Sequence, residues 1–453
     1  MTATALAPAS TDSYAKYVNP QWVALLDLLG LNVEYTRCLG AELFTADGRC
    51  IVDFLSGYCV HNTGHNHPDI IRAVKNELDE CGPVMLQSNG PHLAGQLAER
   101  LCTLAGGGLT KVFFGSSGSE GVEAAIKFAR ASTGRAGLLA AKSSFHGLTA
   151  GALSLMTDAF WREGFGPLLD DTAAVSFGDL PALEAQLRTK RFAAFIVEPV
   201  QAEAGIVLPP ADYLAAARRL CNETQTLLVL DEVQTGMFRT GKFLAAHHFA
   251  VQPDIVVLAK ALSGGLVPVS AVLMKENIYD AVYNSLKRAI VHTSTFSENS
   301  LSMRAGLATL DVLERSDLGK RAELLGERFR AQLRHELSGY EMLKDVRGLG
   351  LLSGIEFQAP QKLTLKVAFE SFRKIHPAMF GQIVVRKMFR EKNFLTQICG
   401  NNFNVLKAAP PLVATEEHLD GFVKSLREIV DEMHTSMSFW SEALSLARNA
   451  IRI

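Results

Sequence analysis

Asp254-Ile-Val-Val-Leu-Ala-Lys260 contains the most informative residue of the chain, Lys260, because it has the pattern of a buried strand that ends in a lysine. A second apolar run, Leu227-Leu-Val-Leu230, ends in Asp231. A lysine amine forms Schiff bases with aldehydes, and a carboxylate keeps a pyridine nitrogen protonated. The pair therefore indicates pyridoxal-phosphate chemistry, although either residue alone is also an ordinary solvated strand end.

A small-residue loop upstream is suited to a phosphate. Lys111–Phe114 has the pattern of a buried strand, and the Gly/Ser-rich loop after it leads into an amphipathic helix, Glu120–Arg130. Such a junction gathers free N–H groups, hydroxyls and the positive end of the helix dipole. Ser117, Gly118 and Ser119 are therefore candidate phosphate ligands, with an ordinary helix cap as the alternative.

Polar residues repeatedly follow apolar strands in this chain. Ala193–Val197 is followed by Glu198, just as the next strand is followed by Asp231, and a helical pattern at Tyr213–Asn222 separates the two. This alternation predicts an α/β fold with a mainly parallel sheet covered by helices. Because the carboxyl ends of parallel strands share one edge, we expect Glu198, Asp231, Lys260 and the phosphate loop to converge.

The chain resembles the class III (ω-type) pyridoxal-phosphate aminotransferases of fold type I from about Tyr17 to its C-terminus. It is most similar to the putrescine, ornithine and acetylornithine aminotransferase group. The matching blocks, in the family's order, are Phe54–Tyr58 with Gly64–Pro68, Gly115–Glu120, Phe145–Gly147, Glu198–Glu203, Asp231–Gly236, Leu258–Lys260, Ser294–Phe296 and Ala409–Leu412. The resemblance implies a large domain with a mainly parallel sheet and a smaller α+β domain.

The resemblance also implies a role for each site residue around pyridoxal 5'-phosphate. Lys260 would form the Schiff base and move the substrate proton, and Asp231 would pair with the ring nitrogen. The other contacts would be Ser117, Gly118 and Ser119 to the phosphate, Phe145 and Val233 on the two ring faces, Gln234 to the ring hydroxyl, and Glu198 and His146 in support. Thr295 would reach the phosphate bound by a partner subunit, which makes the active unit a homodimer with shared sites.

Some of these residues also have plain structural interpretations. Phe145 is one of 25 phenylalanines, Val233 is unremarkable without its motif, Thr295 can cap a turn, and His146 beside a glycine is typical of a structural hydrogen bonder. The roles that the resemblance implies for these four residues are therefore hypotheses.

The histidines His61, His65 and His67 raise the question of a zinc site. Gly64 and Pro68 beside them indicate a turn, and no cysteine or acidic ligand has suitable spacing. We therefore expect no metal at this segment.

Lys407 departs from the family pattern. Many relatives that use a dicarboxylate have an arginine there, whose planar fork binds a carboxylate through two hydrogen bonds. Lysine is a point charge, which weakens the expected specificity for 2-oxoglutarate. In relatives, an acidic residue at the position of Glu203 pairs with the basic one and releases it when a carboxylate arrives. Tyr58 lies where ornithine-type relatives have an aromatic gate, and Ala202 replaces the usual glycine.

These features predict a transaminase that moves a primary amino group from a diamine, ornithine-like or lysine-like donor to a keto acid such as 2-oxoglutarate or pyruvate. A pyridoxal-phosphate aminomutase or decarboxylase on the same fold is the alternative enzyme. The alternative that is not an enzyme is a catalytically silent homologue. The joint presence of Lys260, Asp231 and the phosphate loop argues against it.

Composition agrees with a large enzyme. The 453 residues are 48% hydrophobic with a net charge of −2, which allows a sizeable core and offers no basic field for nucleic acid. The seven cysteines are scattered without CxxC pairs, as in reduced cytoplasmic proteins. No apolar run approaches membrane-spanning length, and Met1–Ser13 lacks the features of a signal peptide. We expect a cytoplasmic protein.

The pattern and the resemblance divide the chain into residues 1–69 and 318–453 of a small domain and residues 70–317 of a large cofactor-binding domain. In the small domain we expect a strand at Gly350–Phe357 and a helix at Thr415–Met433.

The stretch Leu363–Asn393 is unusually apolar for the group. Its predicted amphipathic helix has an apolar face made of Val367, Phe369, Phe372, Ile375 and Met379. Core packing is the favoured interpretation, and a tunnel wall or dimer contact is the alternative.

Overall fold

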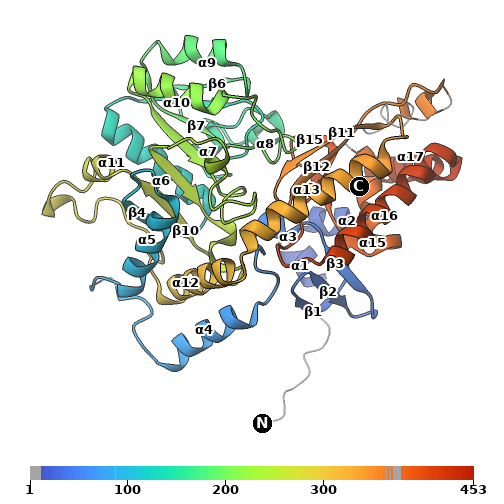
Figure 1. The fold of residues 1–453 in the computed structure, drawn as a ribbon, viewed down its shortest axis with the longest axis horizontal. Coiled ribbons are helices and arrows are strands. Elements are labelled where there is room, and N and C mark those ends of the chain that lie inside the picture. Colours follow the sequence, from blue (N-terminus) through green and yellow to red (C-terminus); the bar gives the residue numbers. More distant parts are fainter. Residues whose placement is uncertain (1–11, 87, 364, 368, 371–378, 453) are drawn as a thin grey trace.

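The computed structural model describes residues 12–86, 88–363, 365–367, 369–370 and 379–452 (Figure 1). The strands of the described chain form one seven-stranded sheet and two four-stranded sheets. The helices are α1 (Asp12–Tyr17), α2 (Pro20–Leu29), α3 (Ser56–Cys59), α4 (Pro68–Asp79), α5 (His92–Ala105), α6 (Gly118–Thr133), α7 (Ala150–Ser154), α8 (Ala159–Arg162), α9 (Leu180–Leu187), α10 (Tyr213–Thr224), α11 (Glu276–Asp280), α12 (Ser300–Arg315), α13 (Leu318–Leu337), α15 (Met379–Lys392), α16 (Glu416–Thr435) and α17 (Met437–Arg452), with short 3-10 turns η1 (Ala245–His248), η2 (Lys260–Ser263) and η3 (Leu286–Arg288).

The large sheet has the strand order β4-β10-β9-β8-β7-β5-β6. Its strands are β4 (Lys111–Gly115), β5 (Gly137–Ala141), β6 (Thr172–Val175), β7 (Phe192–Val197), β8 (Leu227–Asp231), β9 (Ile255–Leu258) and β10 (Ser270–Met274). Only β10 is antiparallel to its neighbours, and the other pairs are parallel. The prediction of a mainly parallel sheet is confirmed.

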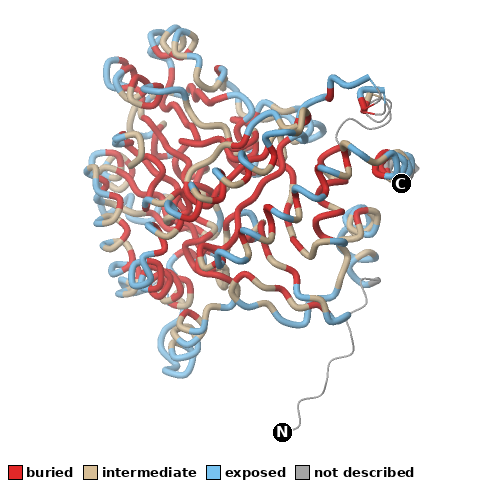
Figure 2. The backbone as a smooth tube through the Cα atoms, turned by 45° about the vertical axis from the view of Figure 1, so that its right-hand side comes forward, coloured by how far each residue is buried: buried red, intermediate tan, exposed pale blue. Residues whose placement is uncertain are grey.

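Helices cover both faces of the large sheet, which explains why its strands are apolar throughout. Alternate residues of β7 point to opposite faces, so that Phe195 joins one core cluster and Ile196 the other. The helix α6 packs on the face of Ile196, whereas α5 and α10 pack on the face of Phe195. Figure 2 shows the buried residues filling this interior. Of the described helices, none has the length and apolarity needed to cross a membrane.

The two smaller sheets combine distant parts of the chain. The first has the order β1 (Tyr35–Leu39), β2 (Glu42–Thr45), β3 (Cys50–Asp53) and β13 (Phe394–Leu395), and β13 pairs in parallel with β3. The second has the order β11 (Leu343–Leu349), β12 (Leu352–Phe357), β15 (Asn402–Ala408) and β14 (Gln397–Cys399). The N-terminal segment therefore lies against C-terminal residues, while the domain limits stay a prediction.

Two predicted elements of the C-terminal portion occur with shifted ends. Thr415 is the N-cap of α16 rather than its first residue. The predicted strand at Gly350–Phe357 begins at Leu352, because Gly350 turns the chain between β11 and β12 with a φ of 53°. A Cβ on Gly350 would lie 2.4 Å from the carbonyl carbon of Thr240, so this turn also depends on the absence of a side chain.

The predicted apolar face within residues 363–393 is only partly observed. Phe369 is buried and its ring lies 5.2 Å from that of Phe380, which agrees with core packing. Val367, however, is 58% exposed, so its assignment to the buried face is wrong. Phe372 and Ile375 lie outside the described residues.

Arg239 joins three parts of the chain. Its fully buried guanidinium donates to the side-chain oxygen of Asn62 at 2.6 and 3.1 Å, to the carbonyl of Leu351 at 3.0 Å and to that of Pro410 at 2.5 Å. Burial lowers the pKa of Arg239. These hydrogen bonds connect the loop after β8 to the N-terminal segment and to the C-terminal sheet, which surround the site described next.

Candidate active site

A cavity of about 460 Å³ lies at the carboxyl ends of β7, β8 and β9. Most of the predicted site residues line it together: Ser117, Gly118, Ser119, Phe145, His146, Glu198, Asp231, Val233, Gln234 and Lys260. The convergence expected from the strand ends is therefore observed. Tyr58, Glu203, Lys407 and Thr295 do not line this cavity, and the first three form a neighbouring cluster.

Lys260 follows β9 and begins η2 with a φ of 44°. This left-handed conformation is costly for a residue with a side chain and is typical of functional positions. Burial lowers the pKa of the Lys260 amine, and the nearby negative charges of Glu203 and Asp231 only partly oppose this effect. A lowered pKa makes the neutral, nucleophilic amine more available.

Asp231 is held at the end of β8 by two hydrogen bonds. One of its oxygens lies 2.8 Å from Nδ1 of His146, and the other accepts the N–H of Val233 at 3.1 Å. Burial opposes charge on His146, but the hydrogen bond and charge of Asp231 raise its pKa above the usual value. Nε2 of His146 is buried and has no hydrogen-bond partner among the described residues. The imidazole therefore supports Asp231 from inside the fold.

Glu198 fixes the backbone around the cavity. It accepts the N–H of Phe145 at 3.0 Å and that of Ala202 at 3.2 Å. Burial raises the pKa of Glu198 to about 7, with a further contribution from the charge of Asp231. Glu198 thus orients Phe145 through its main chain.

The predicted phosphate loop has the geometry of a helix start. Ser117 is the N-cap of α6. Two glycines allow close packing here. A Cβ on Gly118 would lie 2.9 Å from Cγ1 of Val233, and one on Gly147 would lie 2.1 Å from Oγ of Ser119. Gly147 also has a φ of 119°, which strongly favours glycine.

The cluster beside the cavity centres on an ion pair between Lys407 and Glu203. Lys407 lies fully buried on β15, and its Nζ binds Oε1 of Glu203 and lies 3.3 Å from Oε1 of Gln234. Burial opposes both charges, yet each partner stabilises the other. The pKa of Lys407 is raised, and that of Glu203 is lowered to about 2. Lys407 therefore points into the fold and not to solvent.

Tyr58 lies over this ion pair on an unusual turn. Nζ of Lys407 is 5.2 Å from the centre of the Tyr58 ring. The four residues Ser56–Cys59 all have φ between 52° and 69°, so α3 is a left-handed turn. Asp53 holds its start by accepting the N–H groups of Leu55 and Ser56, each at 2.8 Å.

Thr295 is exposed and is not among the residues lining the cavity of its own chain. The sequence interpretation also missed several lining residues, among them Ser116, Gly147 and the loop Ser263–Val269. The sequence does carry a signal for the loop Ser263–Val269, because this stretch contains glycines and closely follows Lys260.

The three histidines of the zinc question have structural partners. His65 is 2.7 Å from Asp53, His61 stacks on His65 at 3.8 Å, and His67 caps α4. Within the described ranges, no three His, Cys, Asp or Glu side chains gather in a way that could hold a metal.

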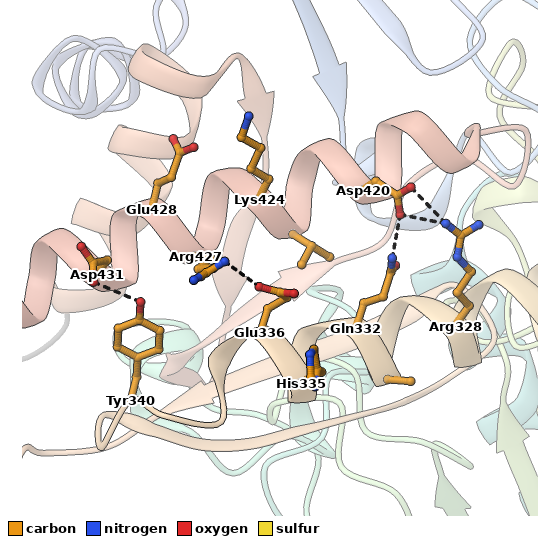
Figure 3. A pocket seen from close by; sticks show the side chains of 12 residues that line it. Arg328, Gln332, His335, Glu336, Tyr340, Asp420, Lys424, Arg427, Glu428 and Asp431 are labelled. Carbon is orange, nitrogen blue, oxygen red and sulfur yellow. Dashed lines mark hydrogen bonds and ion pairs between the residues drawn. The ribbon is translucent and has the colours of Figure 1, made fainter.

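A larger surface groove of about 950 Å³ lies between α13 and α16 (Figure 3). Its polar side chains pair with one another across the two helices. Arg328 binds Asp420 at 3.0 Å, and Arg427 binds Glu336 at 2.9 Å. Because none of its lining residues is a predicted site residue and these charges compensate each other, the groove reflects helix packing rather than the candidate site.

Sequence comparison places the chain among known enzymes. The profile described as Aminotransferase class-III matches residues 29–430. The aminotransferase PigE of Serratia sp. is 36% identical over 94% of this chain, which spans only 53% of that relative. The putrescine aminotransferase of Pectobacterium atrosepticum is 34% identical over 94% of this chain and 89% of its own.

Solved structures agree with the sequence comparison. The ornithine aminotransferase of Toxoplasma gondii is 29% identical with a TM-score of 0.80, covering 94% of this chain and 100% of that one. The acetylornithine aminotransferase of Elizabethkingia anophelis is 32% identical with a TM-score of 0.72, covering 91% and 99%. The fold is that of the fold type I enzymes. The chain belongs to the class III aminotransferase family.

Replacement of Glu198 by Gln should weaken the pH dependence of stability of the cofactor-free protein. The pKa of this carboxyl rises from an ordinary 4.5 to about 7 on folding, so the folded state holds an additional proton between these values. The free energy of unfolding of the wild type should therefore fall as pH rises through this window. Urea denaturation at several pH values measures the fall, which should be smaller in Glu198→Gln.

The matched control is Glu163→Gln, at an exposed position directly after α8. It should keep the wild-type pH dependence. Burial also raises the pKa of Glu232 to about 7. Glu232 remains in both variants, so part of the pH dependence of stability should persist in each. An unchanged pH profile in Glu198→Gln would contradict the raised pKa.

Proposed function

We propose that this chain catalyses pyridoxal-phosphate-dependent transamination between a primary amine or ω-amino acid and a keto acid. The observation that carries the proposal is the convergence of Lys260, Asp231 and the phosphate loop in one cavity. The volume of about 460 Å³ lies within the range of small-molecule sites, about 300–1,000 Å³. Its lining combines an amine, a carboxylate and a helix start.

The cavity residues fit pyridoxal 5'-phosphate, which is the cofactor of this site. The start of α6 offers free N–H groups and the hydroxyls of Ser117 and Ser119 for the phosphate. Asp231 offers a buried carboxylate for the ring nitrogen, and Lys260 an amine for the aldehyde. Phe145 offers an aromatic face. The implied roles of Gly118, Val233, Gln234, Glu198 and His146 are part of the same proposal.

When bound, the cofactor supplies an aldehyde that exchanges amines and a ring that withdraws electrons from the substrate carbon. The amine of Lys260 holds the cofactor between turnovers. Once displaced by substrate, the same nitrogen would take the proton from the substrate carbon and hold it for transfer back. The lowered pKa of Lys260 favours this work as a base.

Asp231 stabilises positive charge at the ring nitrogen, and His146 keeps its carboxylate in place. A fixed charge in a buried site stabilises the transition state more than a solvated one does. The 2.8 Å contact with Nδ1 of His146 also fixes the orientation of this carboxylate.

The substrate proposal rests on the ion pair of Lys407 and Glu203. In the paired state Glu203 neutralises the lysine, so the pocket admits the tail of a diamine, ornithine-like or lysine-like donor. Release of Glu203 would free Lys407 to bind the carboxylate of 2-oxoglutarate or pyruvate. Tyr58, 5.2 Å from Nζ of Lys407, would border the same substrate end. The relatives named for putrescine and ornithine support this donor class.

The active unit in this proposal is a homodimer. The loop around η3 exposes large apolar side chains, with Leu286 96%, Ile290 80% and Phe296 64% exposed. Figure 1 shows this segment, between α11 and α12, projecting from the large sheet. Thr295 lies on it, where it would reach the phosphate of the other subunit. The proposal also includes a cytoplasmic location, and a division of the chain into a small domain of residues 1–69 and 318–453 and a large domain of residues 70–317.

The direct test is a half-reaction screen on purified protein. Donor amines should shift the absorbance of the bound cofactor, and a keto acid should then restore it. Lys260→Ala should retain the cofactor through its phosphate and ring contacts but lose turnover by several orders of magnitude, because it lacks the base. Carbon dioxide release, or no exchange with any keto acid, would instead favour a decarboxylase or an aminomutase.

Lys407→Ala should raise the KM for the keto acid by at least about tenfold while changing that for the amine donor little, because only the acceptor loses its charge partner. Lys407→Arg should improve the use of 2-oxoglutarate by restoring the planar fork. Glu203→Ala should improve the turnover of α-carboxylated donors, because no carboxylate of the protein then competes with the donor carboxylate for Lys407. Separate half-reaction kinetics measure these effects.

The control for these variants is Lys387→Ala. Lys387 is a buried lysine that pairs with Glu391 and Glu432 away from the site. Its loss should leave the ratio of the two KM values unchanged. Equal changes for donor and acceptor in Lys407→Ala would remove the support for a switch.

A further inference from the structure

The two-residue turn between β14 and β15 reaches across to the large sheet. Figure 1 shows β15 beside α8, which belongs to the other part of the fold. The side-chain oxygen of Asn401 accepts the indole N–H of Trp161 at 2.8 Å. Its amide nitrogen donates to the carbonyls of Ser143 at 2.9 Å and Ser144 at 3.4 Å. Asn401 therefore holds the chain directly before Phe145.

The aromatic rings continue this connection. The ring of Trp161 meets that of Phe145 edge to face, with centroids 5.3 Å apart and planes at 78°. The positive edge of one ring then faces the negative face of the other, which favours this arrangement. Asn401 thus fixes both the backbone and the ring neighbour of the residue proposed to cover the cofactor.

The same turn also contacts the acidic member of the ion pair. Gly400 donates its N–H to Oε2 of Glu203 at 2.8 Å, and the N–H of Asn401 donates to the carbonyl of Glu203 at 2.9 Å. A Cβ on Gly400 would lie 3.1 Å from Oε2 of Glu203 and 3.4 Å from Cζ2 of Trp161. The glycine therefore lets the turn fit between the ion pair and the aromatic wall.

We propose that Asn401 is a positioning residue that keeps this turn in place when Glu203 releases Lys407. The inference rests on the proposed function. A Glu203 carboxylate that leaves Lys407 also gives up the N–H of Gly400. The side chain of Asn401 then anchors the turn through Trp161 and the two serine carbonyls, so the wall at Phe145 stays ordered during the acceptor half-reaction.

The test uses Asn401→Leu, which keeps the volume of the side chain and removes its hydrogen bonds. The kcat/KM of the keto-acid half-reaction should fall about tenfold, because release of Glu203 then also frees the turn, while the amine half-reaction should change less than about twofold. Asn401→Asp keeps the acceptor for Trp161 but loses the amide donor, and should show an intermediate loss. Asn404→Leu, at an exposed position on β15, is the matched control and should leave both half-reactions unchanged.

A second measurement reports the contact without turnover. In a Trp22→Phe background, which leaves Trp161 and Trp440, the fluorescence emission of the cofactor-free protein should shift in Asn401→Leu, because the indole of Trp161 loses its hydrogen-bond partner. The shift should disappear when Trp161→Phe is added, because Trp440 alone then emits. Asn401→Leu and Trp161→Phe should be non-additive in the keto-acid half-reaction, because both remove one shared hydrogen bond.

Two results would overturn the inference while the proposed function stands: equal losses in both half-reactions, which mark a merely structural role, or no loss in either. Absence of amino transfer by the wild type with every donor and acceptor would instead overturn the proposed function, and the inference with it.

Discussion

The structure depends on the parallel pairing of β7, β8 and β9. Parallel strands end at a common edge, and in this chain each ends in or leads into a polar residue of the site: Glu198, Asp231 and Lys260. Continuous apolar strands covered by helices on both faces fix the register of these ends. The geometry of the cavity is thus a consequence of the sheet, and the phosphate loop joins it because α6 packs on the same sheet.

Charge compensation below this edge explains how several ionisable groups are buried together. Two buried pairs lie within hydrogen-bond distance, Asp231 with His146 and Lys407 with Glu203. Removing one member of such a pair leaves an uncompensated buried charge, which costs about 3–5 kcal/mol. A substrate carboxylate that replaces Glu203 as partner of Lys407 avoids this cost. The ion pair is therefore suited to exchange one anionic partner for another.

The sequence predicted most of the fold and of the cavity because their signals are local. The strands, the helix starts and the family's motifs are short runs of neighbouring residues, and they placed Lys260, Asp231 and the phosphate loop together. Asn401 and Trp161 gave no such signal, because their contact joins residues far apart in the sequence and neither belongs to a recognisable motif. Val367 was misassigned because helical spacing alone does not tell which neighbours cover a residue.

Lys260 is the residue proposed to carry the cofactor, in a cavity built by the ends of three parallel strands. Borohydride reduction of the purified protein, followed by proteolysis and mass spectrometry of the labelled peptide, tests this role most directly. We expect a single cofactor label, on Lys260. A label on another lysine, or no label in a protein that contains stoichiometric cofactor, would contradict this role.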